Sequence, residues 1–173
     1  ERSHAAMTVS YTAGASGMPC GFLKGFLGSD LAKNNPNIKF VDCPFTGGQL
    51  AAVPAIRPDV AIIHAQRADL AGNVHLWGIV GIQREVALAA KHVIVTVEEV
   101  VDRLDVSPNA CLLPSWVVSA VCHAPLGAAP SYADGYYERD NEFYKAWDGI
   151  SRDRDIFAKW IDEHVMAETA IRM

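Results

Sequence analysis

The sequence predicts an α/β fold with a largely parallel, open sheet flanked by helices. Two apolar runs, Val60–Ile63 and His92–Val97, are typical of strands that helices cover on both faces. Between them, residues 81–91 carry apolar side chains at nearly helical spacing. Buried strands that alternate with helices favour parallel neighbours, because each helix returns the chain to the starting edge of the sheet. The length of 173 residues suits one domain with a substantial core.

Caps and breakers predict the elements around these strands. Ser3 is expected to cap a first helix, which ends at the glycines that follow. Residues 38–41 have the pattern of a strand. Residues 98–104 are predicted to form a short helix, because acidic side chains at its start suit the helix dipole. Further strands are expected at 111–113 and 116–121.

The C-terminal part of the chain is predicted to be helical within residues 137–166. Acidic and basic side chains alternate there, which is typical of a solvated helical face. We expect these helices to pack on the sheet or on a partner subunit, because one stripe of apolar residues runs along them. The stripe consists of Ile156, Phe157, Trp160, Ile161 and Val165.

Composition and charge argue against several classes of protein. The 15 Lys and Arg against 20 Asp and Glu give a net charge of −5, and basic side chains nowhere concentrate as phosphate binding requires. No apolar run approaches the ~20 residues that span a bilayer. The four cysteines form no Cys-x-x-Cys, and the six histidines show no metal-ligand spacing with them. We therefore expect a cytoplasmic protein with reduced cysteines, without a metal and without a nucleic-acid or membrane partner.

Two polar segments follow the ends of the predicted buried strands. In open α/β sheets ligands bind outside the carboxyl ends of the strands, so both segments are positioned for function. The first holds Asp69 and Asn73, which are also common turn formers. The second holds Glu98 and Glu99, which are also explained as acidic residues at a helix start. His64 lies near the end of its strand and is interpreted as a satisfied core histidine.

Four motifs occur in order along the chain: Gly25-Phe26-Leu27-Gly28-Ser29-Asp30-Leu31, Ala68-Asp69-x-x-Gly72-Asn73, Val97-Glu98-Glu99-Val100-Val101-Asp102 and Pro125-Leu126-Gly127-Ala128-Ala129-Pro130-Ser131. In this order and separation they resemble the α subunit of the class I (family I) coenzyme A transferases, although Leu126 replaces a Gly of the family pattern. The chain is most similar to the glutaconate CoA-transferase α-like branch. That branch includes the α subunits of a steroid ring-cleaving hydrolase, to which the segment 131–140 points particularly.

The resemblance implies a CoA-transferase type of fold over residues 1–173, within an α2β2 enzyme that moves CoA between an acyl-CoA thioester and a carboxylic acid. The nucleophile is then a glutamate in a Glu-Asn-Gly context on the β subunit, and this sequence contains no Glu-Asn-Gly. CoA is part of the substrate, and no metal or redox cofactor is implied. The family's α subunit begins with a strand and a glycine-rich loop that this chain does not contain. We therefore expect the family's N-terminal portion to be missing.

The resemblance also suggests site residues. Gly28 and Ser29 are candidates for shaping a substrate pocket around the tetrahedral oxyanion, although Ser29 is equally explained as a helix cap. Asn73 is a third substrate-binding candidate. The alternative activity is a hydrolase that opens a ring in a steroid-derived cyclic keto acyl-CoA, for which Glu1 would be the catalytic residue. A third interpretation is an inactive fragment or a structural subunit.

Overall fold

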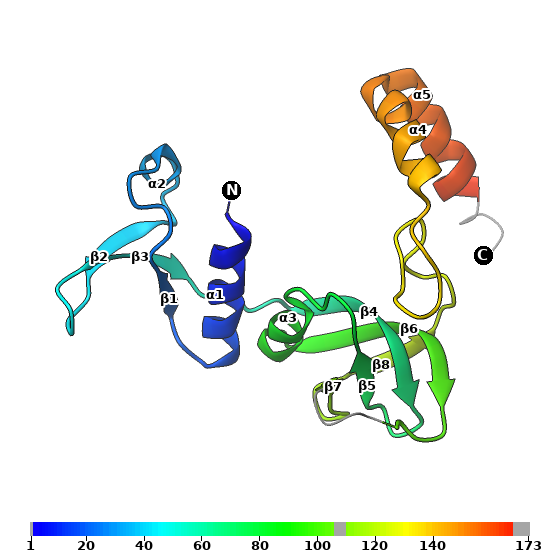
Figure 1. Ribbon diagram of the computed structural model, residues 1–173, viewed down its shortest axis with the longest axis horizontal. Helices are drawn as coiled ribbons and strands as arrows, with labels where there is room; N and C mark the ends of the chain where they lie inside the picture. The colour runs from blue at the N-terminus through cyan, green and yellow to red at the C-terminus, as the bar shows by residue number, and fades with distance from the viewer. Residues whose placement is uncertain (1, 106–109, 168–173) are drawn as a thin grey trace. The chain divides into compact units, whose positions relative to one another are not determined.

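The computed structural model describes residues 2–105 and 110–167 of the chain. The chain divides into two compact units, residues 1–127 and residues 128–173. Within the described residues, the first unit holds two β-sheets and three helices, and the second holds two α-helices and a π-helical turn. The ribbon in Figure 1 identifies each of these elements.

The larger sheet of the first unit has five strands in the order β7-β5-β4-β6-β8. Its parallel part consists of β4 (Val60–Asp69), β6 (His92–Val101) and β8 (Ala120–His123). The short strands β5 (Val74–Leu76) and β7 (Cys111–Leu113) add to the other side of β4 in antiparallel orientation. The predicted α/β class is confirmed, with its parallel pairing concentrated in the three strands around β6.

The smaller sheet is antiparallel and has the order β1-β3-β2. Its strands are β1 (Cys20–Leu23), β2 (Lys39–Asp42) and β3 (Gln49–Pro54), and the short helix α2 (Asp30–Asn34) lies between β1 and β2 in the sequence. The sequence predicted β2 but neither β1 nor β3, since both strands are rich in small residues that have weak strand preference.

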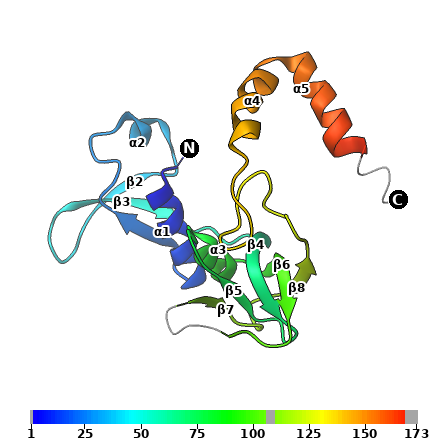
Figure 2. The ribbon, with the colours of Figure 1, turned by 45° about the vertical axis from the view of Figure 1, so that its right-hand side comes forward.

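Helix α1 (His4–Ala15) packs against β1 and β3 and against α3 (Gln83–Ala89) (Figures 1 and 2). The predicted N-terminal cap is confirmed, because the Ser3 hydroxyl accepts a hydrogen bond from the Ala6 backbone N–H at 3.2 Å. The helix continues beyond the predicted end, through Gly14.

The main core lies on one face of the five-stranded sheet. It contains alternate side chains of β4 and β6 together with residues of β5, β7 and α3: Ala61, Ile63, Ala65, Val93, Val95, Val97, Val74, Leu76, Leu113 and Ala87. The prediction that Val60–Ile63 is buried on both faces is wrong for the described chain, because the Ile62 side chain on the opposite face is 76% exposed. Residues 60–65 therefore follow the two-residue alternation of a sheet with one covered face.

The predicted helix over 98–104 is also wrong. Strand β6 continues to Val101, because β4 extends to Asp69 and pairs with it residue by residue, as in Arg67 opposite Glu99. Parallel pairing thus outweighs the local preference of the acidic residues for a helix start. The strand expected at 116–121 begins only at Ala120, since residues before it form a turn in which the Val117 N–H donates to the Pro114 carbonyl.

The second unit contains α4 (Asn141–Arg152), α5 (Arg154–Ile161) and a π-helical turn η1 (Asp162–Met166). The predicted C-terminal helices are therefore present, and α4 begins at 141 because the Asp140 carboxylate accepts a hydrogen bond from the Phe143 N–H. Aromatic rings join α4 to α5, with the Trp147 and Trp160 centroids 4.8 Å apart. Across the part of the chain that is described, the structure contains no helix that is both long and apolar enough for a membrane span.

Candidate functional site

A group of polar side chains lies on the face opposite the core, in the middle of β4 and β6 and beside the carboxyl end of β8. His64 on β4 lies directly opposite Thr96 on β6 in the parallel register. Glu98 follows on the same face of β6, because side chains alternate along a strand. The backbone N–H of Leu126, in the loop after β8, completes the group, which we call the His64–Glu98 cluster and define as His64, Thr96, Glu98 and Leu126.

The two ring nitrogens of His64 are both engaged. Nε2 lies 2.6 Å from Oε1 of Glu98, and Nδ1 lies 2.9 Å from the hydroxyl oxygen of Thr96. The Thr96 hydroxyl also lies 3.4 Å from the Ile63 carbonyl, to which it can donate. A neutral ring that donates from Nε2 accepts from Thr96, whereas a charged ring donates to both partners. Thr96 can satisfy either protonation state of the ring.

The Glu98 carboxylate is almost completely withdrawn from solvent, with 3% of its side-chain surface exposed against 18% for His64. Its second oxygen, Oε2, accepts a hydrogen bond of 2.8 Å from the backbone N–H of Leu126. The backbone carbonyl of Glu98 lies 3.1 Å from Nε2 of His123. Since both carboxylate oxygens hold protein groups, Glu98 is suited to orienting other groups rather than to attacking a substrate.

The Asp69–Asn73 turn between β4 and β5 is closed by its own side chains. The Asp69 carboxylate accepts hydrogen bonds from the backbone N–H of Asn73 at 2.9 Å and from its side-chain amide at 2.9 and 3.2 Å. Burial alone would raise the pKa of Asp69, but the donors of Asn73, with the Ala71 and Leu104 N–H groups, lower that pKa below its ordinary value. The Asn73 amide oxygen accepts from the Ser115 N–H.

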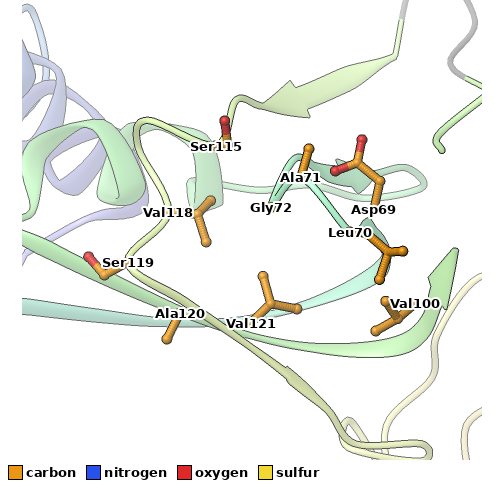
Figure 3. A pocket seen from close by; sticks show the side chains of 10 residues that line it. All are labelled: Asp69, Leu70, Ala71, Gly72, Val100, Ser115, Val118, Ser119, Ala120 and Val121. Atoms are coloured by element: carbon orange, nitrogen blue, oxygen red, sulfur yellow. The ribbon is translucent and has the colours of Figure 1, made fainter. Parts of the chain in front are cut away.

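A pocket of about 370 Å³ lies beside this turn (Figure 3). Its apolar wall includes Leu70, Val100 and Val121, while the carboxylate of Asp69 is directed away from Leu70 and Val100 (Figure 3). The Ser119 hydroxyl in its wall already accepts a hydrogen bond from the Val93 N–H. The pocket thus combines apolar side chains with polar groups, of which Asp69 and Ser119 are already hydrogen-bonded within the protein.

A second pocket, of about 470 Å³, lies where β4, β5 and β7 meet. It is lined by Arg67, His75 and Trp77, with the Arg67 guanidinium 5.7 Å from the centroid of the Trp77 ring. Burial and the neighbouring charge of Arg67 lower the pKa of His75, which favours the neutral imidazole. Glu99 lies 2.7 Å from Arg67 Nε and compensates its charge.

No cluster of three or more metal-ligating side chains occurs in the ranges 2–105 and 110–167.

Comparison with known proteins gives a consistent result. The family model described as Coenzyme A transferase matches residues 3–124, which include both sheets. This chain belongs to the coenzyme A transferase family. It is 64% identical over 165 residues to the A-type subunit of 3-oxoadipate CoA-transferase from Pseudomonas knackmussii, covering 95% of this chain and 58% of the relative. It is 40% identical over 130 residues to the A-type subunit of glutaconate CoA-transferase from Acidaminococcus fermentans, covering 73% of this chain and 41% of the relative.

Solved structures show the same scaffold. The crystal structure of glutaconate coenzyme A-transferase from Acidaminococcus fermentans matches 95% of this chain and 57% of that chain, with a TM-score of 0.80 and 33% identity. A variant of the decarboxylase AibA/AibB matches 93% of this chain and 60% of that chain, with a TM-score of 0.74 and 32% identity. The coenzyme A transferase chain described here thus spans less than two thirds of the length of these relatives.

The predicted site residues of this coenzyme A transferase family member lie in loops next to different sheets. Gly28, with φ of 74°, and Ser29 lie in the connection between β1 and α2, next to the small sheet. The Ser29 hydroxyl accepts a hydrogen bond of 3.1 Å from the Leu31 N–H, so it caps α2. Asn73 belongs to the five-stranded sheet and holds its turn closed. Glu1 lies outside the described residues.

The sequence reasoning missed His64 and Glu98 as members of one cluster. His64 was interpreted as a core residue, and Glu98 was assigned to a helix. The signal that could have found them is the register: aligning the apolar starts of the two buried strands, Val60 with His92, places His64 beside Thr96. That alignment required residues 92–101 to be recognised as one long strand.

Proposed function

We propose that this chain is the α-type part of a CoA-transferase, which moves CoA between an acyl-CoA thioester and a carboxylic acid. The observation that carries the proposal is the 64% identity, over 95% of the chain, to the A-type chain of a 3-oxoadipate CoA-transferase. The names of both curated relatives specify dicarboxylates, 3-oxoadipate and glutaconate. The proposed acid substrate is therefore a dicarboxylic acid of similar length.

The proposed reaction needs a second polypeptide. Both curated relatives are named as the A-type subunits of their enzymes, which supports a B-type partner. The family resemblance puts the nucleophile on that β subunit, in a Glu-Asn-Gly context, and this chain contains no such sequence. An α2β2 assembly is the stoichiometry that the resemblance implies.

The proposed chemistry proceeds by two exchanges on that glutamate. Its carboxylate attacks the thioester carbonyl and expels CoA thiolate, which gives a mixed anhydride. The thiolate then attacks the glutamyl carbonyl, releases the first acid and leaves a glutamyl-CoA thioester. The incoming dicarboxylate reverses both steps. Each tetrahedral intermediate requires hydrogen-bond donors for its oxyanion.

This chain would contribute one wall of the site. The carboxyl ends of β4, β6 and β8 are the edge at which open α/β sheets bind ligands. Gly28 and Ser29 remain candidates for the α side of the oxyanion pocket. Asn73 is a weaker candidate, because its amide groups are committed to Asp69 and Ser115.

The similarity to a decarboxylase shows that this scaffold also occurs in an enzyme named for another reaction. Ring-opening hydrolysis, with Glu1 as the catalytic residue, is the second candidate, which the resemblance of segment 131–140 to the hydrolase branch supports.

The test uses the full-length protein co-purified with a β-type subunit of the same family. The complex is incubated with succinyl-CoA and either 3-oxoadipate or glutaconate, and the CoA esters are identified by mass spectrometry. Transfer predicts a new dicarboxylyl-CoA that forms only when the free acid is present. Replacing the partner's Glu-Asn-Gly glutamate by alanine is expected to abolish the product.

Two other outcomes would contradict CoA transfer. Conversion of a cyclic keto acyl-CoA to a ring-opened ester without any acid acceptor would identify the hydrolase. A stable complex that converts neither type of substrate would identify a structural subunit.

A further inference from the structure

The loop after β8 has an unusual conformation and an unusual support. Leu126 has φ of 61°, in the left-handed region that L side chains rarely adopt, and 61% of its surface is exposed. The backbone N–H of this residue is held by the buried Glu98 carboxylate at 2.8 Å. A buried side chain of β6 therefore fixes the backbone of an exposed loop.

His64 supports the same loop from a second direction. A Cβ atom on Gly127 would lie 2.7 Å from Cε1 of His64 and 2.8 Å from the Ala124 carbonyl oxygen. Only a glycine allows the chain to pass this close to the imidazole. The ring that orients Glu98 is thus also the surface on which the loop rests.

Stability alone gives a weak reason for this arrangement. Withdrawing a carboxylate from water costs free energy. A buried ion pair with imidazole often stabilises the folded protein no more than well-packed apolar side chains would. Here the carboxylate holds a single turn whose Leu126 and Gly127 are exposed. Backbone held in a rare conformation by surrounding groups is found preferentially at ligand sites.

We propose that His64 and Glu98 are positioning residues that hold the loop 124–127 in the shape that binds the acyl-CoA substrate. The inference rests on the proposed function, because it takes the ligand class from there. The loop follows directly from the carboxyl end of β8, at the edge where ligands bind in such sheets. Neither residue touches the reacting atoms in this assignment: both act through the loop.

The cluster offers a conservative variant that separates shape from charge. In Glu98→Gln, the amide oxygen can accept from Leu126 N–H and the amide nitrogen can donate to an unprotonated Nε2 of His64. His64 then donates from Nδ1 to Thr96, which lies 2.9 Å away. Glu98→Gln therefore keeps the support of the loop, and Glu98→Ala removes it.

The experiment compares these two variants in the assembled enzyme, with succinyl-CoA and 3-oxoadipate as probes. The KM for the CoA ester and kcat are measured, together with hydrogen exchange in the peptide that contains Leu126. Glu98→Ala is expected to raise KM about 10-fold and to accelerate exchange, with kcat within about 3-fold. Glu98→Gln is expected to stay within about 3-fold of wild type in all three quantities.

Three results would overturn the assignment. An unchanged KM in Glu98→Ala with faster exchange would show that the loop does not bind the substrate. Equal damage in Glu98→Gln and Glu98→Ala would show that the charge itself is required. A loss confined to kcat would assign Glu98 to the chemical step.

Two controls keep the result interpretable. Should Glu98→Ala fail to assemble, Gly127→Ala displaces the loop from His64 without touching the carboxylate, and the same rise in KM is expected. If the wild-type complex shows no turnover, the proposed function has failed. Protection of the Leu126 peptide by succinyl-CoA then tests the loop separately, and absence of protection overturns its role in binding.

Discussion

At the scale of single residues, the Asp69 carboxylate shows how an acidic side chain can be structural beside a candidate site. Its pKa is lowered, so it contributes stability above its unfolded pKa, which is near 3.8, and that contribution is lost as the pH falls through the folded value. Asn73→Ala removes the amide nitrogen that donates to both oxygens of Asp69 and the amide oxygen that accepts from the Ser115 N–H. We expect a loss of about 1–3 kcal/mol in the free energy of unfolding at neutral pH.

The measurement is urea denaturation of wild type and variant as a function of pH. Because Asn73→Ala raises the folded pKa of Asp69 toward its unfolded value, the acid destabilisation that Asp69 causes should be smaller in the variant and should end at a higher pH. Ser115→Ala is the matched control: it keeps the backbone N–H that donates to Asn73 and should change stability by no more than about 0.5 kcal/mol. Identical stability of Asn73→Ala and Ser115→Ala would contradict a closing role for the amide.

Cys43 provides a prediction about thiol reactivity. A hydrogen bond from the Thr46 side chain, with backbone N–H groups of Phe45 and Thr46, lowers the pKa of Cys43, whereas burial raises the pKa of Cys111. The thiolate is the reactive form, so iodoacetamide should modify Cys43 before Cys111 at neutral pH. Peptide mass spectrometry follows both sites. Thr46→Val should slow Cys43 alone, and an unchanged Cys43 rate would refute the hydrogen-bond explanation.

At the scale of elements, two helical glycines occupy opposite environments. A Cβ atom on Gly14 in α1 would lie 2.0 Å from the Ile56 carbonyl oxygen, whereas one on Gly149 in α4 meets nothing within 4 Å. Gly14→Ala should therefore destabilise the protein by about 2 kcal/mol or more. Gly149→Ala should stabilise its helix by about 0.5–1 kcal/mol, because alanine has the higher helix propensity. The measurement is the midpoint temperature of thermal unfolding. A shift of this temperature in the same direction for both variants would contradict the prediction.

The helices and strands also show which parts of the fold could be predicted from the sequence. The strands at 60 and 92, the Ser3 cap and the C-terminal helices follow from local patterns and were predicted. Strand β1 was missed because Gly21 is required by tertiary packing: a Cβ atom there would lie 2.3 Å from Cγ1 of Val9 on α1. The extension of β6 through Glu98 depends on pairing with β4, which no local pattern contains.

The candidate site, too, could be predicted only in part from the sequence. The two chain segments that contain it, around β4 and β6, could be predicted from the alternation of strands and helices. The pairing of His64 with Glu98 could not, because it depends on the register of two strands distant in sequence. Sequence motifs located Leu126 and Gly127 in a family segment, but only the backbone geometry reveals that Glu98 and His64 support them.

At the scale of the whole molecule, burial is distributed unevenly among the elements. Strands β4 and β6 carry most of the main core and pair along nearly their full lengths, whereas α4 and α5 contain no buried residue. Local opening is easiest where few apolar contacts must be broken. We therefore expect the slowest hydrogen exchange in β4 and β6, and much faster exchange in α4 and α5.

Hydrogen exchange measured by mass spectrometry tests this order, with Trp160→Ala as the informative variant. Trp160 contacts the rings of Phe143 and Trp147 across the helix pair and stacks on His164, so its removal should accelerate exchange over 141–166. Trp116→Ala is the control, because that side chain is 80% exposed and its loss should leave exchange in the same helices unchanged. Slower exchange in α4 than in β6 would show that burial within the chain does not determine which elements open first.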